Sequence, residues 1–145
     1  MDNSTDITED AVLLEQEIIT QLTNNAFSLV DGITIGDGEN AVTHRRVEFR
    51  ELTAGDVIDA QAAAEKVVST PQGPQLVTSP TLMGVEVMRR QIATVGDLKG
   101  PLSMTLVKKL SNTDFNRLSI ALDVKDQALA AQVSNNRGRV AAVSE

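Results

Sequence analysis

The alternation of apolar and polar residues predicts a β-hairpin in the first third of the chain. Residues 41–51 alternate with the two-residue period of a half-buried strand, with Val47 and Phe49 on one side. A second apolar segment, residues 27–35, precedes it, and the sequence GDGEN between the two is a strong turn signal. Because a lone two-stranded hairpin is only marginally stable in water, we expect it to pack on helices or on a second copy.

A helix is predicted directly after the second strand. Thr53 is a candidate N-cap, and Asp56 three residues later completes a short version of the capping box. Apolar residues then recur at helical spacing, which predicts a helix over residues 53–69. The segment TPQGP, residues 70–74, ends this helix because proline and glycine break helices.

Three more helices complete the predicted fold. Ser79 followed by Pro80 is the favoured order at a helix start, and this helix extends over residues 79–95. A short helix covers residues 103–110, and a final helix over residues 112–132 is capped by one of its first two residues. The prediction is an α+β fold, mostly α, in which an N-terminal β-hairpin is followed by a small bundle of about four helices.

The chain is predicted to divide into one domain and two ends. Residues 1–24 form an acidic, partly disordered leader, in which residues 11–22 could form a short helix. Residues 25–132 form a single hairpin-plus-helical domain, and residues 133–145 form a flexible C-terminal tail. The length of 145 residues is sufficient for one domain with a modest core.

The acidic charge is concentrated near the N-terminus. The formal net charge is -7, and residues 1–44 contain nine acidic residues and no Lys or Arg. Acidic surfaces disfavour phosphates, and the chain has no Trp or Tyr to stack on bases. The basic pairs that begin at Arg45, Arg89 and Lys108 are therefore interpreted as solvated faces. We expect no nucleic-acid partner.

The absence of Cys and of long apolar segments indicates where in the cell the chain acts. The chain has no Cys, so it has neither a disulfide framework nor a thiolate metal site. It lacks the pattern of a signal peptide, and no apolar run approaches the ~20 residues of a membrane span. The prediction is a cytoplasmic chain without a membrane partner.

No residue pattern indicates catalysis or metal binding. The only histidine, His44, is interpreted as a solvated residue at the end of a strand. Gly32, Gly36 and Gly38 do not match a phosphate-binding loop and are interpreted as turn residues. The acidic residues beside them lack the spacing of a calcium loop. The sequence therefore predicts a protein that is not an enzyme and that has no cofactor and no metal.

The methionines leave two interpretations open. Met83, Met88 and Met104 could make the adaptable contacts found at permissive binding surfaces, or they could fill the core. With three Phe and no Trp or Tyr, the core lacks large aromatic anchors. A hairpin and helices of this composition could leave an apolar groove exposed, where a partner would bind.

Two short motifs resemble the tail assembly chaperones of Mu-like contractile-tailed bacteriophages. The first is VEFRELTAGD, residues 47–56, where the family has a polar hairpin that leads into R-E-(P/L)-T-x-G-D and a helix. The second is LSNTDFNRL, residues 110–118, which is similar to L-(S/T)-x-x-D-F-x-x-L. The resemblance covers roughly residues 25–132. Leu52 stands where the family often has Pro, and the acidic leader is longer than is typical.

The resemblance implies a protein that is not an enzyme and that acts in the host cytoplasm. Such chaperones bind the tape measure protein, keep it soluble until the tail tube assembles around it, and are absent from the mature virion. The family often also makes a frameshift-extended version of the chain, which would be a further partner. Exposed strand edges and apolar helix faces add the expectation of a homo-oligomer.

The client's apolar helical stripe would fit a groove between helices of this chain. On this basis Val57, Val85 and Met88 are predicted to contact the partner. Two other functions stay open. The chain could be a structural tail or baseplate component that remains in the virion, or a small acidic regulatory protein that acts through its N-terminal carboxylates.

Overall fold

The computed structural model describes the backbone of residues 3–143 and the side chains of residues 8–135. Helices and antiparallel strands are mixed along the chain, which confirms the α+β class. In chain order the elements are α1 (Asn3–Thr23), β1 (Ser28–Ile35), the 3₁₀ turn η1 (Gly38–Asn40), β2 (Val42–Phe49), α2 (Ala54–Ala63), β3 (Glu65–Thr70), β4 (Gly73–Thr78), α3 (Pro80–Arg90), β5 (Ile92–Val95), β6 (Leu98–Lys99), α4 (Met104–Lys109) and α5 (Asn112–Val143).

A four-stranded antiparallel sheet in the order β1-β2-β5-β6 lies at the centre of the fold. The predicted hairpin is confirmed, since β1 pairs with β2 and Ile33 lies opposite His44. β5 pairs with the other edge of β2, where Val47 lies opposite Val95. The sheet thus supplies the hairpin with the additional strands that a stable sheet needs.

β1 bends at an irregular step between Ser28 and Ile33. Gly32 lies within this bend at a φ of +78°, a backbone conformation that favours glycine. A Cβ at this position would also lie 2.6 Å from the carbonyl oxygen of His44. The bend therefore depends on glycine at residue 32.

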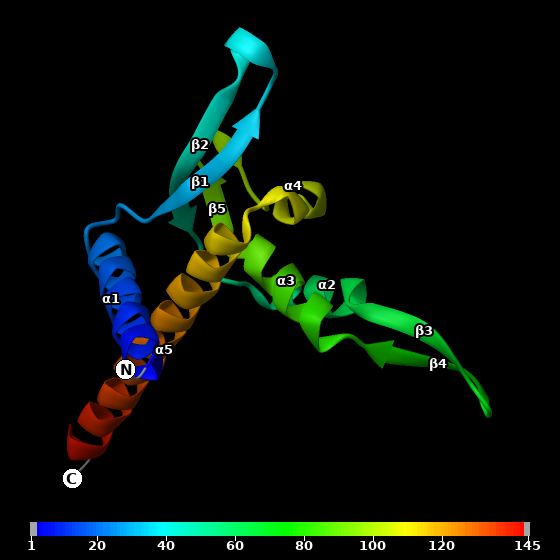
Figure 1. Cartoon of the computed structure of the whole chain (residues 1–145). Coiled ribbons are helices and arrows are strands. Elements are labelled where there is room, and N and C mark those ends of the chain that lie inside the picture. The colour runs from blue at the N-terminus through cyan, green and yellow to red at the C-terminus, as the bar shows by residue number, and fades with distance from the viewer. Residues whose placement is uncertain (1–2, 144–145) are drawn as a thin grey trace.

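The core lies between this sheet and the helices α1, α3, α4 and α5, as the arrangement in Figure 1 indicates. The rings of Phe27 and Phe49 pack with their centroids 5.5 Å apart. The other buried core side chains are aliphatic: Ile18, Leu29, Ile33, Val47, Met88, Ile92, Val95, Leu102, Val107, Leu118, Ala121 and Leu122.

The helices do not form the small four-helix bundle that the sequence predicts. The main helix contacts are made by two separate pairs, α1 with α5 and α2 with α3. In Figure 1 α1 and α5 lie toward the left of the view, α2 and α3 lie toward the right, and the short helix α4 lies above α3. The two pairs meet mainly where α3 contacts α5, so the four helices do not share one bundle core.

The predicted helix over residues 53–69 is wrong in its second half. α2 ends at Ala63, and the chain continues as the hairpin of β3 and β4. The segment TPQGP is the turn of this hairpin, with Gly73 at a φ of +106°. Val67, Val68 and Thr70 suit a strand, because β-branched side chains favour extended backbone.

The predicted helix over residues 79–95 is also too long. α3 ends at Arg90, and the sequence Ile-Ala-Thr-Val that follows forms β5. Ile92 and Val95 are spaced as they would be on a helix face, but pairing with β2 places them in the sheet. Tertiary pairing here overrides the helical spacing.

Both end helices are longer than predicted. α1 begins at Asn3, although its first residues were expected to be disordered, and its Ile18 is buried in the core. α5 continues to Val143, although the final helix was expected to fray near Gln132. α1 and α5 pack against each other, which gives their apolar residues the partner that a lone helix lacks. Residues 1–2 and 144–145, parts of the predicted leader and tail, lie outside the described residues.

The helix starts follow local capping. Thr53 Oγ1 accepts the N–H of Asp56 at 3.1 Å, and the Asp56 carboxylate accepts the N–H of Thr53 at 2.8 Å, which confirms the predicted capping box. Ser79 is the N-cap of α3, as predicted, and Ser103, the predicted start of the short helix, is the N-cap of α4. The cap of α5 lies one residue earlier than predicted. The hydroxyl of Ser111 accepts the N–H of Asp114.

Candidate functional site

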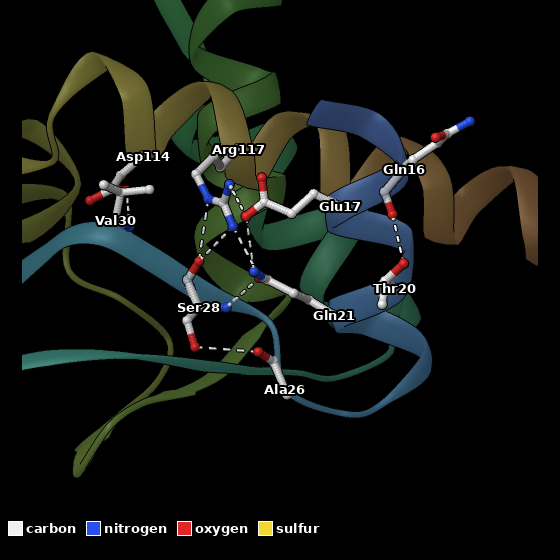
Figure 2. A network of polar contacts seen from close by, with 9 residues as sticks. All are labelled: Gln16, Glu17, Thr20, Gln21, Ala26, Ser28, Val30, Asp114 and Arg117. Atoms are coloured by element: carbon white, nitrogen blue, oxygen red, sulfur yellow. Dashed lines mark hydrogen bonds and ion pairs between the residues drawn. The ribbon is translucent and has the colours of Figure 1, made fainter. Parts of the chain in front are cut away.

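Asp114 connects the first turn of α5 to the bend in β1 (Figure 2). The side chain is fully buried. Its carboxylate accepts three consecutive backbone N–H groups, those of Val30 at 2.7 Å, Asp31 at 3.1 Å and Gly32 at 2.8 Å. Hydrogen bonds to a charged acceptor are stronger than those between neutral groups. Asp114 therefore holds the bend of β1 against α5.

Arg117 lies one turn further along α5 and is also buried. As Figure 2 shows, its guanidinium donates to the carbonyl oxygen of Ser28 at 3.0 Å and to the side-chain oxygen of Gln21 at 3.0 Å. It also lies over the ring of Phe27 and 3.5 Å from the Glu17 carboxylate. Every buried polar side-chain atom among the described residues has a hydrogen-bond partner, so this network is structural.

Arg50, in the motif RELTAGD, joins the end of β2 to two helices. Its guanidinium donates to the Asp56 carboxylate at 2.7 Å and to the backbone carbonyl of Arg90 at the end of α3. The Thr53 N–H, followed by the Arg50 guanidinium, lowers the pKa of Asp56 to about 2. The motif therefore builds the joint between the sheet and the pair formed by α2 and α3.

One of the three basic pairs is not the solvated face that the sequence predicts. Arg89 and Arg90 are mostly buried and both form ion pairs with Glu86, which is itself buried. Burial raises the pKa of Glu86, but the hydrogen bonds from these two arginines outweigh it, and the pKa lies below its usual value. The pairs that begin at Arg45 and Lys108 are exposed, as predicted.

His44 lies inside the sheet and not at a solvated strand end, so this prediction is wrong. The side chain is 9% exposed, and Nδ1 accepts the N–H of Asp97 at 3.3 Å. A Cβ at Gly96 would lie 2.6 Å from the same nitrogen, which shows how closely the turn packs on this ring. Among the residues that the structure describes, no group of three or more His, Asp or Glu could hold a metal ion.

The most prominent exposed apolar surface is formed by α2 and the hairpin of β3 and β4, residues 54–78, which we call the arm. In Figure 1 this hairpin projects from the rest of the molecule. Val67 is 72% exposed and Leu76 is 62% exposed, while α2 exposes Val57 and Ile58. Exposed apolar patches of this kind are typical of interaction sites. The arm is therefore the candidate partner-binding surface.

The structure does not bring the three predicted contact residues together. Val57 is exposed on the arm, whereas Val85 is half-buried against the core and Met88 is only 7% exposed within it. Leu76 was not among the predicted contact residues because the predicted helix ended before it, and Ile58 was counted only among the apolar residues of that helix. The signal that could have found the hairpin was the pair of branched residues, Val67 and Val68, shortly before a turn sequence that contains Pro and Gly.

A second exposed apolar stripe lies on the two end helices. Leu129 and Val133 are exposed one turn apart on α5, beside a shallow hollow that they share with Asp126. Val12 and Leu13 are exposed on α1. These residues lie on long regular helices, so their backbone groups are already paired, in contrast to the free strand edges of the arm.

Residues 29–139 match the protein family described as tail assembly protein gp41. This stretch extends from β1 into α5 and covers more than half of the chain. The chain belongs to the gp41 tail assembly protein family. The resemblance to Mu-like phage tail assembly proteins is thereby confirmed, and a role in phage tail assembly follows.

Individual gp41 relatives agree with this assignment. The chain is 52% identical over 136 residues to the probable tail assembly protein gp41 of Escherichia phage Mu, which covers 94% of each chain. It is 50% identical over 129 residues to the probable tail assembly protein FS-gp41 of the same phage, covering 89% of this chain and 69% of that relative. It is 47% identical over 95 residues to the Mu-like prophage FluMu protein gp41 of Haemophilus influenzae, with 65% and 74% covered. No solved structure matches the chain.

In this gp41-family chain both sequence motifs have structural roles. RELTAGD forms the joint at the root of the arm through Arg50 and Asp56. LSNTDFNRL supplies Asp114 and Arg117, which join α5 to β1. Over residues 3–143, no helix combines the length and the apolar character that a membrane crossing requires.

Proposed function

We propose that this chain is a tail assembly chaperone that binds the tape measure protein and keeps it soluble until the tail tube assembles around it. The observation that carries the proposal is the arm, whose side chains Ile58, Val67 and Leu76 are large, apolar and exposed. A long helical client exposes apolar stripes before it is enclosed, and an apolar surface on a partner can cover them. Membership in the gp41 tail assembly family adds support.

The arm suits weak and reversible binding. Complete burial of one Val, Leu or Ile side chain contributes about 1.5–3 kcal/mol, but association costs about 4–15 kcal/mol in lost freedom of motion. The few exposed residues of one arm would therefore hold a client loosely. Copies that are also joined to one another, as in a homo-oligomer, would still bind one long client firmly through avidity. Each weak contact could then be displaced in turn as tail tube subunits cover the client.

We further propose that the chain acts without catalysis in the host cytoplasm and is absent from the mature virion. The chain covers 94% of phage Mu gp41 but only 69% of FS-gp41. This difference supports an extended version that shares the same fold. Mass spectrometry of purified virions tests the location, because stoichiometric amounts of the chain in the particle would favour a structural tail component.

The client contact is tested by co-purification of a tape measure protein with variants of the arm. Ile58→Asp combined with Leu76→Asp places charge in the exposed apolar surface, while Gln61→Asp combined with Gln75→Asp adds the same charge at exposed polar positions of α2 and β4. We expect the first pair to reduce client recovery about tenfold or more, since losing about 1.4 kcal/mol weakens binding tenfold. If the folded Ile58→Asp and Leu76→Asp variant recovers as much client as the unchanged chain, the arm does not bind the client.

A further inference from the structure

The hairpin of β3 and β4 is a separate two-stranded sheet in the part of the chain that the structure describes. Its residues are exposed on both faces apart from those near the turn. A hairpin of this kind is marginal in water, and an uncovered strand edge is a template for pairing with another chain. The two outer edges of the hairpin therefore need a partner or a device that blocks pairing.

The strand register shows which backbone groups are free. The N–H of Ser79 donates to the carbonyl oxygen of Ala64 at 3.0 Å, so the backbone groups of this pair point inward, toward the neighbouring strand. Inward and outward pairs alternate along an antiparallel ladder. The next pair, Glu65 opposite Thr78, therefore points outward, and so does every second pair toward the turn.

The outward pairs make the two edges different. Pro74, which has no N–H, lies opposite Ser69 in an outward pair, as expected for proline in a strand. The edge of β4 therefore lacks a donor at this position, which blunts it against pairing. The edge of β3 keeps both donor and acceptor at each of its outward residues, Glu65, Val67 and Ser69. β3 is the edge that can accept another strand.

We propose that the β3 edge pairs antiparallel with the β3 edge of a second copy of this chain, about a two-fold axis at Val67. In this register Val67 faces Val67 of the second copy, and Glu65 faces Ser69 of the second copy. All three outward residues of each strand are then paired. The product is a continuous four-stranded sheet in which the two β4 strands, each with its Pro74, form the outer edges.

Charge and side-chain pattern favour this occupant and this direction. Parallel pairing of two β3 strands would place Glu65 beside Glu65 and Lys66 beside Lys66, and like charges opposite each other are destabilising. The antiparallel register instead places Lys66 opposite Val68 of the second copy. Val67 and Leu76 are already opposite each other on one face of the hairpin. The two-fold axis doubles this pair into a row of four apolar side chains across the sheet.

The oligomeric state of the full chain tests the proposal without any client. The result for β3 pairing is therefore independent of the result for tape measure binding. Val67→Pro removes the central outward N–H of β3 and leaves the inward ladder bonds in place. Leu76→Pro makes the same change on the β4 edge and serves as the matched control. By light scattering after size exclusion, we expect the unchanged chain and Leu76→Pro to self-associate, and Val67→Pro to associate at least tenfold more weakly. A monomeric unchanged chain, or equal association of both variants, would overturn the proposal.

A cross-link keeps the test decisive if the proline variant fails to fold. The chain has no Cys, so a single introduced cysteine can form a disulfide only between copies. Across a hydrogen-bonded antiparallel pair the Cα atoms lie about 5.5 Å apart, within the roughly 4.4–6.8 Å that disulfides span. Val67→Cys should therefore form linked dimers on mild oxidation. Leu76→Cys should not, because three strand spacings of about 4.8 Å separate its two copies. Equal cross-linking at both positions, or none at residue 67, would contradict the pairing.

Discussion

Asp114 takes the place of strand pairing where β1 bends. The bend leaves three N–H groups of β1 without a neighbouring strand, and the buried carboxylate accepts all three at 2.7–3.1 Å. A buried carboxylate is costly unless its oxygens are satisfied, and here they are satisfied by backbone that would otherwise be unpaired. At the scale of single residues, these hydrogen bonds explain how the Asp114 side chain can be fully buried.

Replacing Asp114 with Asn tests this role. The amide keeps one acceptor oxygen but turns its NH₂ toward backbone donors, so buried N–H groups lose their partner. We expect Asp114→Asn to lower the free energy of unfolding by about 1–3 kcal/mol, measured by chemical denaturation. Asp123→Asn, an exposed position on the same helix, is the control. A loss no larger than that of the control would show that the Asp114 carboxylate is dispensable.

Asp56 gives the chain a predictable response to acid. Its pKa is lowered from the model-compound value of 3.8 to about 2, mainly by the Thr53 N–H and then by Arg50. The folded state therefore binds the proton less readily than the unfolded state. The stabilisation from Asp56 is complete above about pH 4 and is lost as the pH falls through 3.8 toward 2.

The expected measurement is an NMR titration of the Asp56 carboxyl carbon, with a midpoint near 2. Asp56→Asn should also lose less stability than the unchanged chain between pH 5 and pH 2, since its cap no longer titrates. Asp59→Asn removes the same charge from the exposed side of α2 and should leave this part of the acid response as it was. A midpoint near the model-compound value for Asp56 would disprove the capping account.

Some of these residues could be predicted from the sequence and others could not. Caps such as Thr53 and Ser79 act within three residues of their own positions, so a local pattern reveals them. Asp114 acts on backbone that lies 82–84 residues earlier in the chain, and no local pattern connects the two. His44 was predicted to be solvated for the same reason. The turn at Asp97 that covers it follows β5, which the sequence analysis assigned to a helix.

At the scale of elements, the chain consists of a sheet with helices and an arm that branches from it at Arg50. The hairpin of β1 and β2 was predictable because it combines alternation with a glycine-rich turn. The hairpin of β3 and β4 was not recognised, since TPQGP was interpreted only as a helix stop. A segment rich in proline and glycine can either end a helix or form a hairpin turn, and the branched residues before this one favour the hairpin. The arm, the candidate binding surface, was missed for this reason.

Arg50 should control how firmly the arm is held. Arg50→Met keeps the length of the side chain but removes its bonds to Asp56 and to the Arg90 carbonyl. We expect faster amide hydrogen exchange in the first turn of α2 and the last turn of α3, with little change in α5, because local opening depends on local contacts. Arg45→Met, which loses a bond to the Val30 carbonyl at the exposed edge of the sheet, is the control. Unchanged exchange in α2 would mean that Arg50 is not the joint.

At the scale of the whole molecule, the buried and exposed apolar residues are separated in space. The sheet, α1, α3, α4 and α5 enclose the core, while the arm carries large apolar side chains that no other described residue covers. A stable body with a bare apolar arm is the arrangement expected of a protein that binds exposed apolar segments of a partner. Membership in the gp41 tail assembly family is consistent with the proposed client, the tape measure protein.

The most direct test of the central claim is the solubility of a tape measure protein expressed in cells with and without this chain. The account predicts that the client is largely insoluble alone, becomes soluble with the unchanged chain, and remains insoluble with the Ile58→Asp and Leu76→Asp variant. The variant with Gln61→Asp and Gln75→Asp should rescue the client as the unchanged chain does. A tape measure protein that is equally soluble with and without the chain would contradict the proposed chaperone function.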